Sequence, residues 1–272
     1  MDKLKILFRT AGGKKKNLQL GLGHVYRCIN LAQNLPKSAQ IYFLIEDFGG
    51  VKEILREYGF RKIFLLKNNV PVDDDIKQTL SLIKNENINT IIIDRYNTSV
   101  TYVKEIRKTV KTVVITDLKN IQYSADLVIN GFIGFDNNKI KNRYGTTCLV
   151  GPAFQILNKN FAQKKAIPNK RYTILATFGG LDEQNITKIL LKCLSKYIKK
   201  MKATIILGPI ATQLDLKSLQ NRYGKNLRIL QKTNALQKEI SKACFGFCSG
   251  GITTYEFASM NVPFFIICDD KH

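Results

Sequence analysis

The segment Lys5-Ile6-Leu7-Phe8-Arg9 is a short, continuous apolar run near the start of the chain, and similar runs recur along all 272 residues. A run of this length suits a strand that is buried on both faces. Helical stretches separate the runs, and this alternation predicts an α/β fold with parallel sheets. The first series continues with 41–45, 61–66, 90–94, 112–115 and 127–129, and a second series comprises 172–178, 203–207, 227–230, 244–248 and 263–268.

A polar, lysine-rich stretch that contains Pro168 separates the two series and is typical of an interdomain linker. We therefore predict two Rossmann-like domains, over residues 1–157 and 172–272, joined by a linker over 158–171. The chain stops at His272, directly after a strand, so we expect the helices that would follow this strand to be missing from the C-terminal domain. Because open α/β sheets bind ligands at the carboxyl ends of their strands, two such domains are expected to face a shared cleft.

The charge balance is strongly basic, with 43 Lys and Arg against 21 Asp and Glu and a net charge of +22. Such a surface attracts polyanions, anionic small substrates or peripheral contact with an anionic membrane. The lysines are scattered through every segment, and no run interleaves aromatic residues with arginine as a base-stacking platform would. We therefore expect solvated lysines and no nucleic-acid partner.

No window approaches the roughly 18 consecutive apolar residues that a membrane span needs, and the start does not resemble a signal peptide. These features predict a cytoplasmic protein without a membrane span. The cysteines mostly lie in apolar runs and form no Cys-x-x-Cys pair, so we expect buried, reduced thiols and no metal site. They are Cys28, Cys148, Cys193, Cys244, Cys248 and Cys268.

The motif Gly21-Leu22-Gly23-His24-Val25-Tyr26-Arg27 follows the first strand. Gly21 and Gly23 allow a tight turn, and a helix that starts near His24 offers unpaired N–H groups to a phosphate. Histidine titrates near neutral pH, so His24 suits a general base. Arg27 lies one helical turn further on and either binds a phosphate or faces solvent. The only other histidine is His272, which makes a Ser-His-Asp triad improbable.

Two further glycine loops follow strands of the second series, Phe178-Gly179-Gly180-Leu181-Asp182 and Ser249-Gly250-Gly251-Ile252-Thr253. Each precedes a helical pattern, so each can present backbone N–H groups to a phosphate. Neither loop matches a Walker A motif or the dinucleotide fingerprint, which disfavours ATP hydrolysis and NAD chemistry. We expect no cofactor.

Three polar side chains complete the predicted site. Glu256 lies early in the helix after the second glycine loop, where it either accepts hydrogen bonds from ribose hydroxyls or is an ordinary surface residue. Asp94 and Tyr96 follow the strand 90–94 and are expected to face a sugar, with a helix cap as the alternative for Asp94. The run Asp73-Asp74-Asp75 after Pro71 is expected to form a surface loop.

Together these motifs resemble the UDP-2,4-diacetamido-2,4,6-trideoxy-altropyranose hydrolases of pseudaminic acid biosynthesis and their relatives in spore-coat polysaccharide biosynthesis. The resemblance covers nearly all of the chain. It rests on Gly21-x-Gly23-His24-x-x-Arg27-Cys28-x-x-Leu31-Ala32, Ile93-Asp94-x-Tyr96, Gly151-Pro152-x-Phe154-x-Ile156-Leu157, Phe178-Gly179-Gly180-x-Asp182 and Ser249-Gly250-Gly251-x-Thr253-Thr254-x-Glu256.

This resemblance implies a glycosyltransferase-B fold that hydrolyses a UDP-sugar with inversion at the anomeric carbon and without a metal. His24 would be the catalytic base on the N-terminal, sugar-binding domain. In the C-terminal, nucleotide-binding domain, Glu256 would hold the ribose and the adjoining glycine loop the diphosphate. We expect a monomer whose partner is the small nucleotide-sugar substrate. The alternative is a glycosyltransferase of the same fold with a sugar or lipid acceptor.

Overall fold

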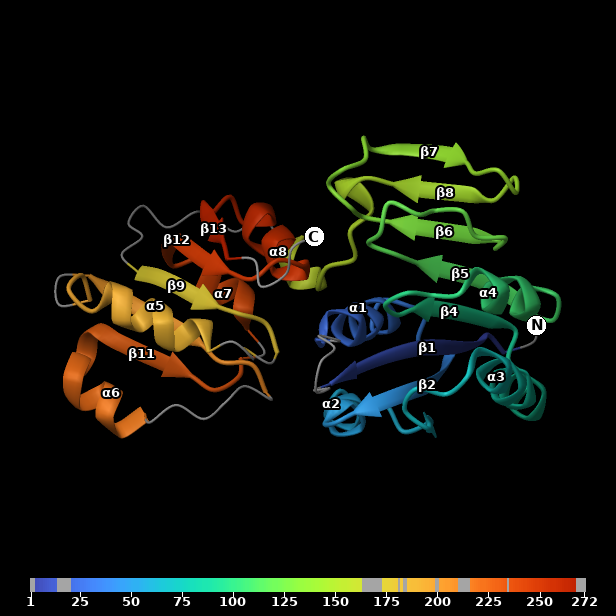
Figure 1. The fold of residues 1–272 in the computed structure, drawn as a ribbon, viewed down its shortest axis with the longest axis horizontal. Helices are drawn as coiled ribbons and strands as arrows, with labels where there is room; N and C mark the ends of the chain where they lie inside the picture. The colour runs from blue at the N-terminus through green and yellow to red at the C-terminus, as the bar shows by residue number, and fades with distance from the viewer. Residues whose placement is uncertain are drawn as a thin grey trace. The chain divides into compact units, whose positions relative to one another are not determined.

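The computed structural model describes residues 3–13, 21–162, 173–180, 182, 185–198, 201–209, 216–233 and 235–267. Contacts between Cα atoms divide the chain into two compact units, Met1–Ile156 and Leu157–His272. Each unit is built around one sheet with helices packed on it, as Figure 1 shows.

The described part of the first unit contains an eight-stranded sheet in the order β3-β2-β1-β4-β5-β6-β8-β7. Neighbouring strands are parallel except for β7, which runs antiparallel to β8. The strands are β1 Lys5–Gly13, β2 Gln40–Phe48, β3 Ile63–Leu66, β4 Thr90–Asp94, β5 Lys111–Ile115, β6 Leu127–Asn130, β7 Asn138–Lys141 and β8 Thr147–Val150, and the helices are α1 Gly23–Ala32, α2 Val51–Glu57, α3 Val72–Glu86 and α4 Val100–Arg107.

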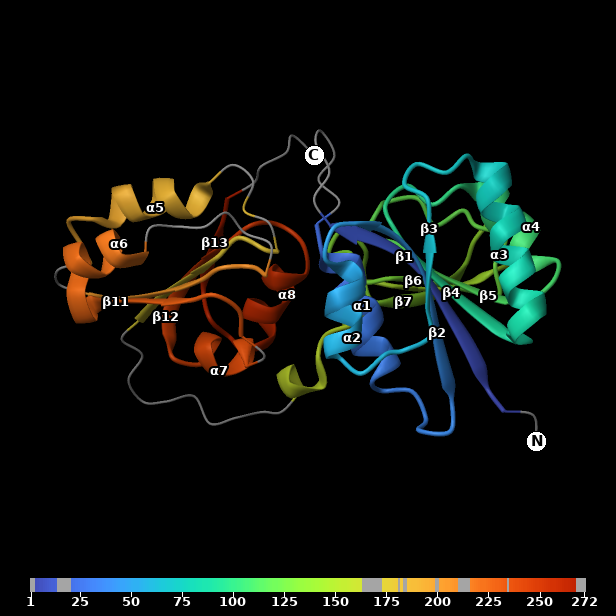
Figure 2. The same cartoon turned by 90° about the horizontal axis from the view of Figure 1, so that it is seen from below.

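Helices cover both faces of this sheet, with α1 and α2 on one side and α3 and α4 on the other (Figure 2). Strand β1 lies between β2 and β4, so successive strands are added on one side of β1 and then on the other. The carboxyl ends of β1 and β4 therefore mark the topological switch point, where sheets of this kind leave a crevice for a ligand.

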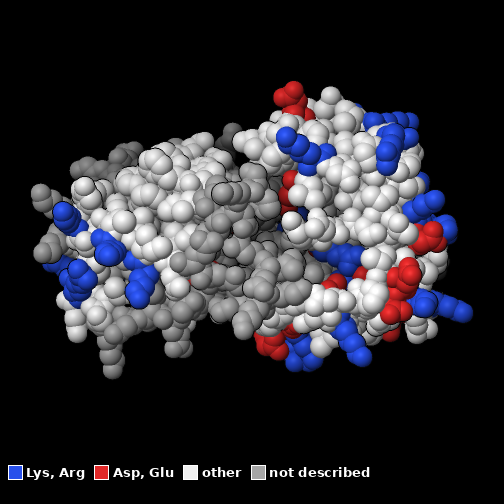
Figure 3. All heavy atoms as spheres, in the orientation of Figure 1, with Lys and Arg blue, Asp and Glu red and all other residues white. Residues whose placement is uncertain are grey.

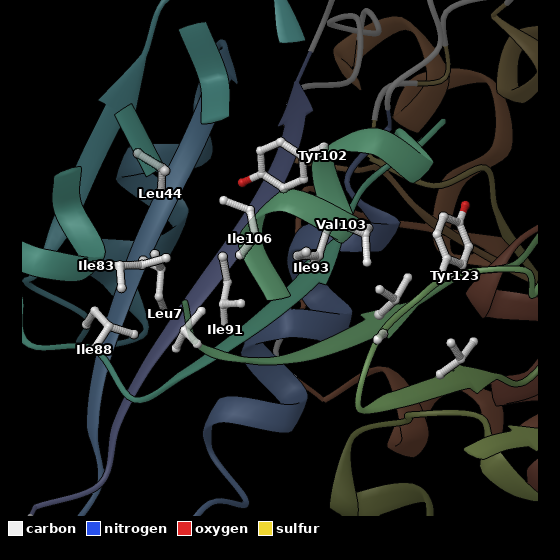
Figure 4. Close-up of a cluster of buried hydrophobic side chains, with 14 of the residues drawn as sticks. Leu7, Leu44, Ile83, Ile88, Ile91, Ile93, Tyr102, Val103, Ile106 and Tyr123 are labelled. Carbon is white, nitrogen blue, oxygen red and sulfur yellow. The ribbon is translucent and has the colours of Figure 1, made fainter. Parts of the chain in front are cut away.

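The main core of the first unit lies between the sheet and the helices α3 and α4 (Figure 4). Ile91 and Ile93 are two residues apart on β4 and point to this face, where they join Tyr102 and Ile106 of α4, and all four are completely buried. Ile92 points to the opposite face and is also buried. Burial on both faces explains why the sequence of β4 is a continuous apolar run rather than an alternating one.

The described part of the second unit contains a five-stranded parallel sheet in the order β11-β10-β9-β12-β13. Its switch point lies between β9 and β12. Helices α5 and α6 cover one face and α7 and α8 the other (Figure 2). The elements are β9 Thr173–Thr177, α5 Ile186–Leu194, β10 Lys202–Ile206, α6 Leu216–Tyr223, β11 Leu227–Leu230, α7 Leu236–Ile240, β12 Ala243–Cys248, α8 Ile252–Ser259 and β13 Phe264–Ile266.

The predicted α/β class and the two sheets of mainly parallel strands are confirmed, and every apolar run predicted as a strand contains one. Two strands were missed, β7 and β8. The sequence of β7, Asn138-Lys139-Ile140-Lys141, is polar because β7 is an exposed edge strand with little to bury. Residues 163–171 of the predicted linker lie outside the described residues. None of the described helices is both long and apolar enough to cross a membrane.

Candidate functional site

The predicted catalytic residue and its neighbours meet at the switch point of the first unit. His24 and Arg27 lie on α1, which follows β1, and Asp94 is the last residue of β4. Strands β1 and β4 are adjacent, and their register pairs Thr10 with Asp94. The fold therefore brings together side chains that are about 70 positions apart in the sequence.

The turn before α1 is closed by backbone contacts. Gly13 donates its N–H to the carbonyl of Gly21 at 3.0 Å, and both residues have positive φ angles, of 113° and 54°. Glycine adopts such angles without the steric cost that a Cβ imposes. No side chain of the described residues caps the N-terminus of α1, and its first turn contains no acidic residue. Within the part of the chain that the structure describes, no side-chain anion competes with a ligand for these N–H groups.

His24 is held by Asp94. The Nδ1 atom of His24 lies 2.7 Å from Oδ1 of Asp94 and 3.1 Å from Nη2 of Arg27. Arg27 already donates Nη2–H to the same Oδ1 at 2.6 Å, so the short histidine contact is best satisfied by Nδ1–H donating to the carboxylate. In that tautomer Nε2 carries a lone pair. The imidazole is 17% exposed, so Nε2 can act as a base on a bound molecule.

Arg27 is buried and forms a two-pronged ion pair with Asp94, through Nε to Oδ2 at 2.7 Å and Nη2 to Oδ1 at 2.6 Å. Its Nη1 donates to Oδ1 of Asp117 at 2.5 Å. Burial alone would lower the pKa of Arg27, but the two carboxylates outweigh it and raise the pKa. The solvent-facing alternative for Arg27 is therefore wrong. The guanidinium is engaged by carboxylates of the protein, which suits positioning rather than phosphate binding.

Asp94 is completely buried, with its carboxylate oxygens held by side chains of α1. Burial would raise its pKa, but the charge and hydrogen bonds of Arg27 and His24 lower it to about 2. The carboxylate is thus ionised at neutral pH. Asp94 neither faces outward, as a sugar contact would need, nor caps a helix, as the alternative supposed. The reason is that α1 packs against the end of β4, where His24 and Arg27 bind the Asp94 carboxylate.

Asp117 was not predicted, although it follows the strand predicted at 112–115 by two residues, which is the signal that could have found it. Its side chain is 46% exposed while it binds Arg27. Tyr96 is 39% exposed and follows Asp94 by two residues. A sugar contact through Tyr96 stays a prediction.

A second buried ion network involves α3, on the opposite face of the sheet from α1. Arg9 is completely buried and donates to Asp75 from Nε at 3.2 Å and Nη2 at 2.9 Å, and to Glu46 at 2.5 Å. Arg95 donates to the same Asp75 at 2.6 Å. Burial would raise the pKa of Asp75, but the two arginines lower it. The expected surface loop at residues 73–75 is therefore wrong: these residues form the first turn of α3, and the arginines draw Asp75 inward.

The glycine loops of the second unit lie side by side at its switch point. They follow the adjacent strands β9 and β12, whose register pairs Thr177 with Cys248. Gly179 has a φ angle of 71°, and a Cβ placed there would lie 3.6 Å from Oγ of Ser249. The predicted residues of the second unit thus lie in one region, at the carboxyl ends of β9 and β12. They are Gly179, Gly180, Ser249, Gly250, Gly251 and Thr253.

The two helices that follow these loops differ at their N-termini. The carboxylate of Asp182 accepts hydrogen bonds from the N–H groups of Ile186 at 2.8 Å and Thr187 at 3.2 Å, so it occupies the start of α5. Helix α8 begins after Gly251 and has no capping side chain among the residues that the structure describes. Because an uncapped helix start presents free N–H groups, the loop before α8 is the better anion site of the two.

Glu256 lies on the second turn of α8 and is only 9% exposed, so the alternative of an ordinary surface residue is wrong. Burial raises the pKa of Glu256 to about 7, although a hydrogen bond from Thr253 opposes the shift. A carboxyl group with this pKa changes its charge close to neutral pH.

Replacing Glu256 with Gln is expected to stabilise the protein at pH 8 and to leave its stability unchanged near pH 4. The folded-state pKa of about 7 lies above the ordinary value of 4.5, so the carboxyl contributes stability below pH 4.5 that is lost as the pH rises through 7. The gain at pH 8 should be about 1 to 3 kcal/mol. Thermal unfolding at both pH values measures it.

The exposed Glu53→Gln variant is the matched control, because it removes the same charge from a surface position. It should change the pH dependence of unfolding little. Identical pH dependence in the wild-type protein and the Glu256→Gln variant would contradict the assignment of Glu256 as a buried titrating group.

Among the described residues, no group of three or more His, Cys, Asp or Glu side chains could hold a metal ion. Cys28, Cys148 and Cys248 are buried, as expected, whereas Cys193 is exposed. Cys268 lies outside the described residues.

No family model matches the chain. The chain is 30% identical to the uncharacterized protein MJ1062 of Methanocaldococcus jannaschii over 289 residues, which cover 98% of this chain and 56% of that protein. It therefore spans little more than half the length of that relative. It is 24% identical to the spore coat polysaccharide biosynthesis protein SpsG of Bacillus subtilis, over 96% of this chain and 76% of that protein.

The solved structures that are similar in fold include the following two. MurG of Acinetobacter baumannii matches with a TM-score of 0.61 and 15% identity, over 97% of this chain and 78% of that chain. The UDP-GlcNAc 2-epimerase of Neisseria meningitidis, bound to UDP-GlcNAc, matches with a TM-score of 0.54 and 10% identity, over 98% and 83% of the two chains. The predicted glycosyltransferase-B fold is confirmed, and the chain is a distant homologue of the spore-coat protein.

Proposed function

We propose that this protein is a UDP-sugar hydrolase of polysaccharide biosynthesis, which releases UDP and a free sugar. The observation that carries the proposal is the His24–Asp94 pair at the switch point of the first unit, with Nδ1 and Oδ1 at 2.7 Å. The name of the spore-coat relative supports a role in polysaccharide biosynthesis, and the neighbour bound to UDP-GlcNAc supports the substrate class. The sugar that we propose is of the 2,4-diacetamido-2,4,6-trideoxy-hexose type, destined for nonulosonic acid or surface polysaccharide.

In this proposal the second unit binds the nucleotide. The uncapped start of α8, with Gly250 and Gly251 before it, supplies N–H groups for the diphosphate. Glu256 accepts hydrogen bonds from the ribose hydroxyls in its ionised form. Since burial raises the pKa of Glu256 to about 7, affinity for UDP should increase as the pH rises through this value.

The first unit supplies the base. His24 takes a proton from water through Nε2 while the water oxygen bonds to the anomeric carbon. The bond from that carbon to the diphosphate oxygen breaks, and UDP leaves with the electron pair. Attack opposite the leaving group inverts the anomeric carbon. General-base help of this kind is typically worth 10²–10⁴-fold in rate, and a preorganised donor to the leaving diphosphate about 2.7–4 kcal/mol.

Turnover of a UDP-sugar in ¹⁸O-labelled water is expected to place the label on the anomeric hydroxyl of the sugar and none on UDP. The base would activate water toward carbon, whereas a pyrophosphatase would attack phosphorus and normally use a divalent metal. A panel of UDP-sugars, followed by mass spectrometry of both products with and without excess EDTA, measures this. Label in the β-phosphate, or activity that vanishes on chelation, would refute glycosyl C–O cleavage.

A glycosyltransferase with a sugar or lipid acceptor is the second candidate. The same histidine geometry favours it, because Nε2 can deprotonate a sugar hydroxyl as well as water. Incubation without an acceptor separates the two activities. A hydrolase releases one UDP for each UDP-sugar consumed, whereas a strict transferase releases none until a hydroxyl acceptor is added.

A further inference from the structure

Helix α5 of the second unit presents an unusual outer face. Its inner side packs Ile186, Leu190 and Leu191 into the core, as expected for an amphipathic helix. On the outer side Ile189 is 58% exposed, and Tyr197, just beyond the helix, is 59% exposed. With the exposed Cys193 these residues recur every four positions and form one apolar stripe on the surface.

A row of lysines runs beside this stripe. Lys188, Lys192 and Lys196 are exposed and also recur every four positions. In the part of the chain that the structure describes, none of the three forms an ion pair with a carboxylate. On the left of Figure 3, Lys and Arg side chains gather over the region that Figure 1 labels α5 and α6.

A hollow of about 420 Å³ adjoins the end of the stripe, and two cationic side chains line it. Lys196 at its edge belongs to the lysine row, and Arg222 comes from the end of α6. Of the described residues, Ser195 and Tyr223 also line it. A guanidinium and an ammonium group on one hollow match the charge of a phosphate.

We propose that the outer face of α5 docks on the surface of an anionic lipid bilayer. The apolar stripe of Ile189, Cys193 and Tyr197 enters the boundary between headgroups and acyl chains, and the lysine row binds lipid phosphates. The hollow beside Lys196 receives one headgroup phosphate. This inference is independent of the proposed catalytic chemistry, because none of its residues belongs to the candidate site.

The arrangement favours a lipid surface over two other occupants. A second copy of the chain, docked through the same face, would bring two basic faces together and offer neither of them an opposite charge. Nucleic acid would neutralise the lysines but offer no apolar medium to Ile189, whereas a bilayer binds the apolar stripe and the lysine row at once.

Cosedimentation of the full chain with vesicles tests the proposal. Vesicles of phosphatidylcholine with 30% phosphatidylglycerol should bind the protein, and pure phosphatidylcholine vesicles should not. The triple variant Lys188→Gln, Lys192→Gln, Lys196→Gln should bind about 100-fold more weakly, since each basic residue contributes about fivefold. The double variant Ile189→Gln, Tyr197→Gln should also lose binding, while it keeps every positive charge.

The matched control removes three exposed helical lysines of the first unit, by Lys77→Gln, Lys84→Gln and Lys104→Gln. This control variant should bind the anionic vesicles far more strongly than the α5 triple variant does. Equal losses of vesicle binding in the two variants would show that only the net charge matters and would overturn the proposal. Unchanged vesicle binding by the apolar double variant would overturn it as well. So would a change of oligomeric state in the α5 variants without vesicles, which would identify an interface between copies.

Discussion

Replacing His24 with Ala is expected to lower the turnover of the UDP-sugar substrate by 10²–10⁴-fold, the usual contribution of a general base. The dissociation constant for UDP should change little, because the nucleotide is assigned to the second unit and the imidazole to the reacting water. Single-turnover rates together with calorimetric UDP binding measure the two effects separately. Since the imidazole is partly exposed, the loss of packing is small.

His24→Asn is the matched control for stability. Its side-chain amide can still donate a hydrogen bond toward Asp94, so it replaces the contact that Nδ1 makes at 2.7 Å, but it has no basic nitrogen. The variant should unfold at nearly the wild-type temperature and be as inactive as His24→Ala. A parallel loss of UDP affinity and of rate in both variants would make His24 a binding residue instead.

Asp94→Asn is expected to have the second largest effect, on stability and on rate together. The substitution leaves the buried guanidinium of Arg27 without its main ionic partner, and breaking such a pair typically costs 3–5 kcal/mol. The pKa of Asp94 is lowered to about 2, so its contribution is present above the ordinary value of 3.8 and is lost as the pH falls through 2. Denaturant unfolding at pH 7 and in acid measures the difference.

The rate effect follows from the histidine. A neutral amide at position 94 can donate to Nδ1 as well as accept from it, so the tautomer with the lone pair on Nε2 is no longer enforced. We expect kcat to fall by about 10²-fold or more with KM nearly unchanged. Asp94 is a positioning residue in this account, because it is completely buried and acts through His24.

Asp75→Asn is the matched control for this second prediction. Asp75 is an equally buried carboxylate between two arginines, Arg9 and Arg95, but it has no contact with His24 among the described residues. It should reduce stability by a similar amount and leave kcat close to normal at a temperature where both variants are folded. An equal fall of kcat in the two variants would attribute the Asp94 effect to general loss of structure.

Much of the fold follows from local sequence. The runs Thr90–Asp94 and Leu227–Leu230 match the observed strands residue for residue. In Thr90–Asp94, burial on both faces explains the consecutive apolar residues Ile91, Ile92 and Ile93. The exposed edge strand β7 does not need apolar residues, and its polar sequence was therefore not recognised as a strand.

The sequence by itself determined the alternation of buried strands with helices, the glycine turn before α1 and the position of His24 at the start of that helix. These depend on residues that are close together in the chain, where backbone preferences and hydrophobic periodicity are strong. The same local information placed the glycine pairs after β9 and β12, but it did not show that Asp182 caps one of the two helices that follow.

Only the tertiary structure decided which charged residues are buried and with which partners. Arg27 and Asp94 form their ion pair across 67 positions, and Arg9 and Asp75 across 66, and no local pattern marks either pair. In sequence, Asp75 looks like the third member of an acidic surface run, and Arg27 like a residue that either binds a phosphate or faces solvent. Strands β1 and β4 pair in parallel, and α1 and α3 pack on opposite faces of their sheet. Arg27 of α1 therefore meets Asp94 of β4, and Asp75 of α3 meets Arg9 of β1. Burying a charge is costly unless an opposite charge meets it, so the partner of each residue is set by the fold and not by its neighbours in the chain.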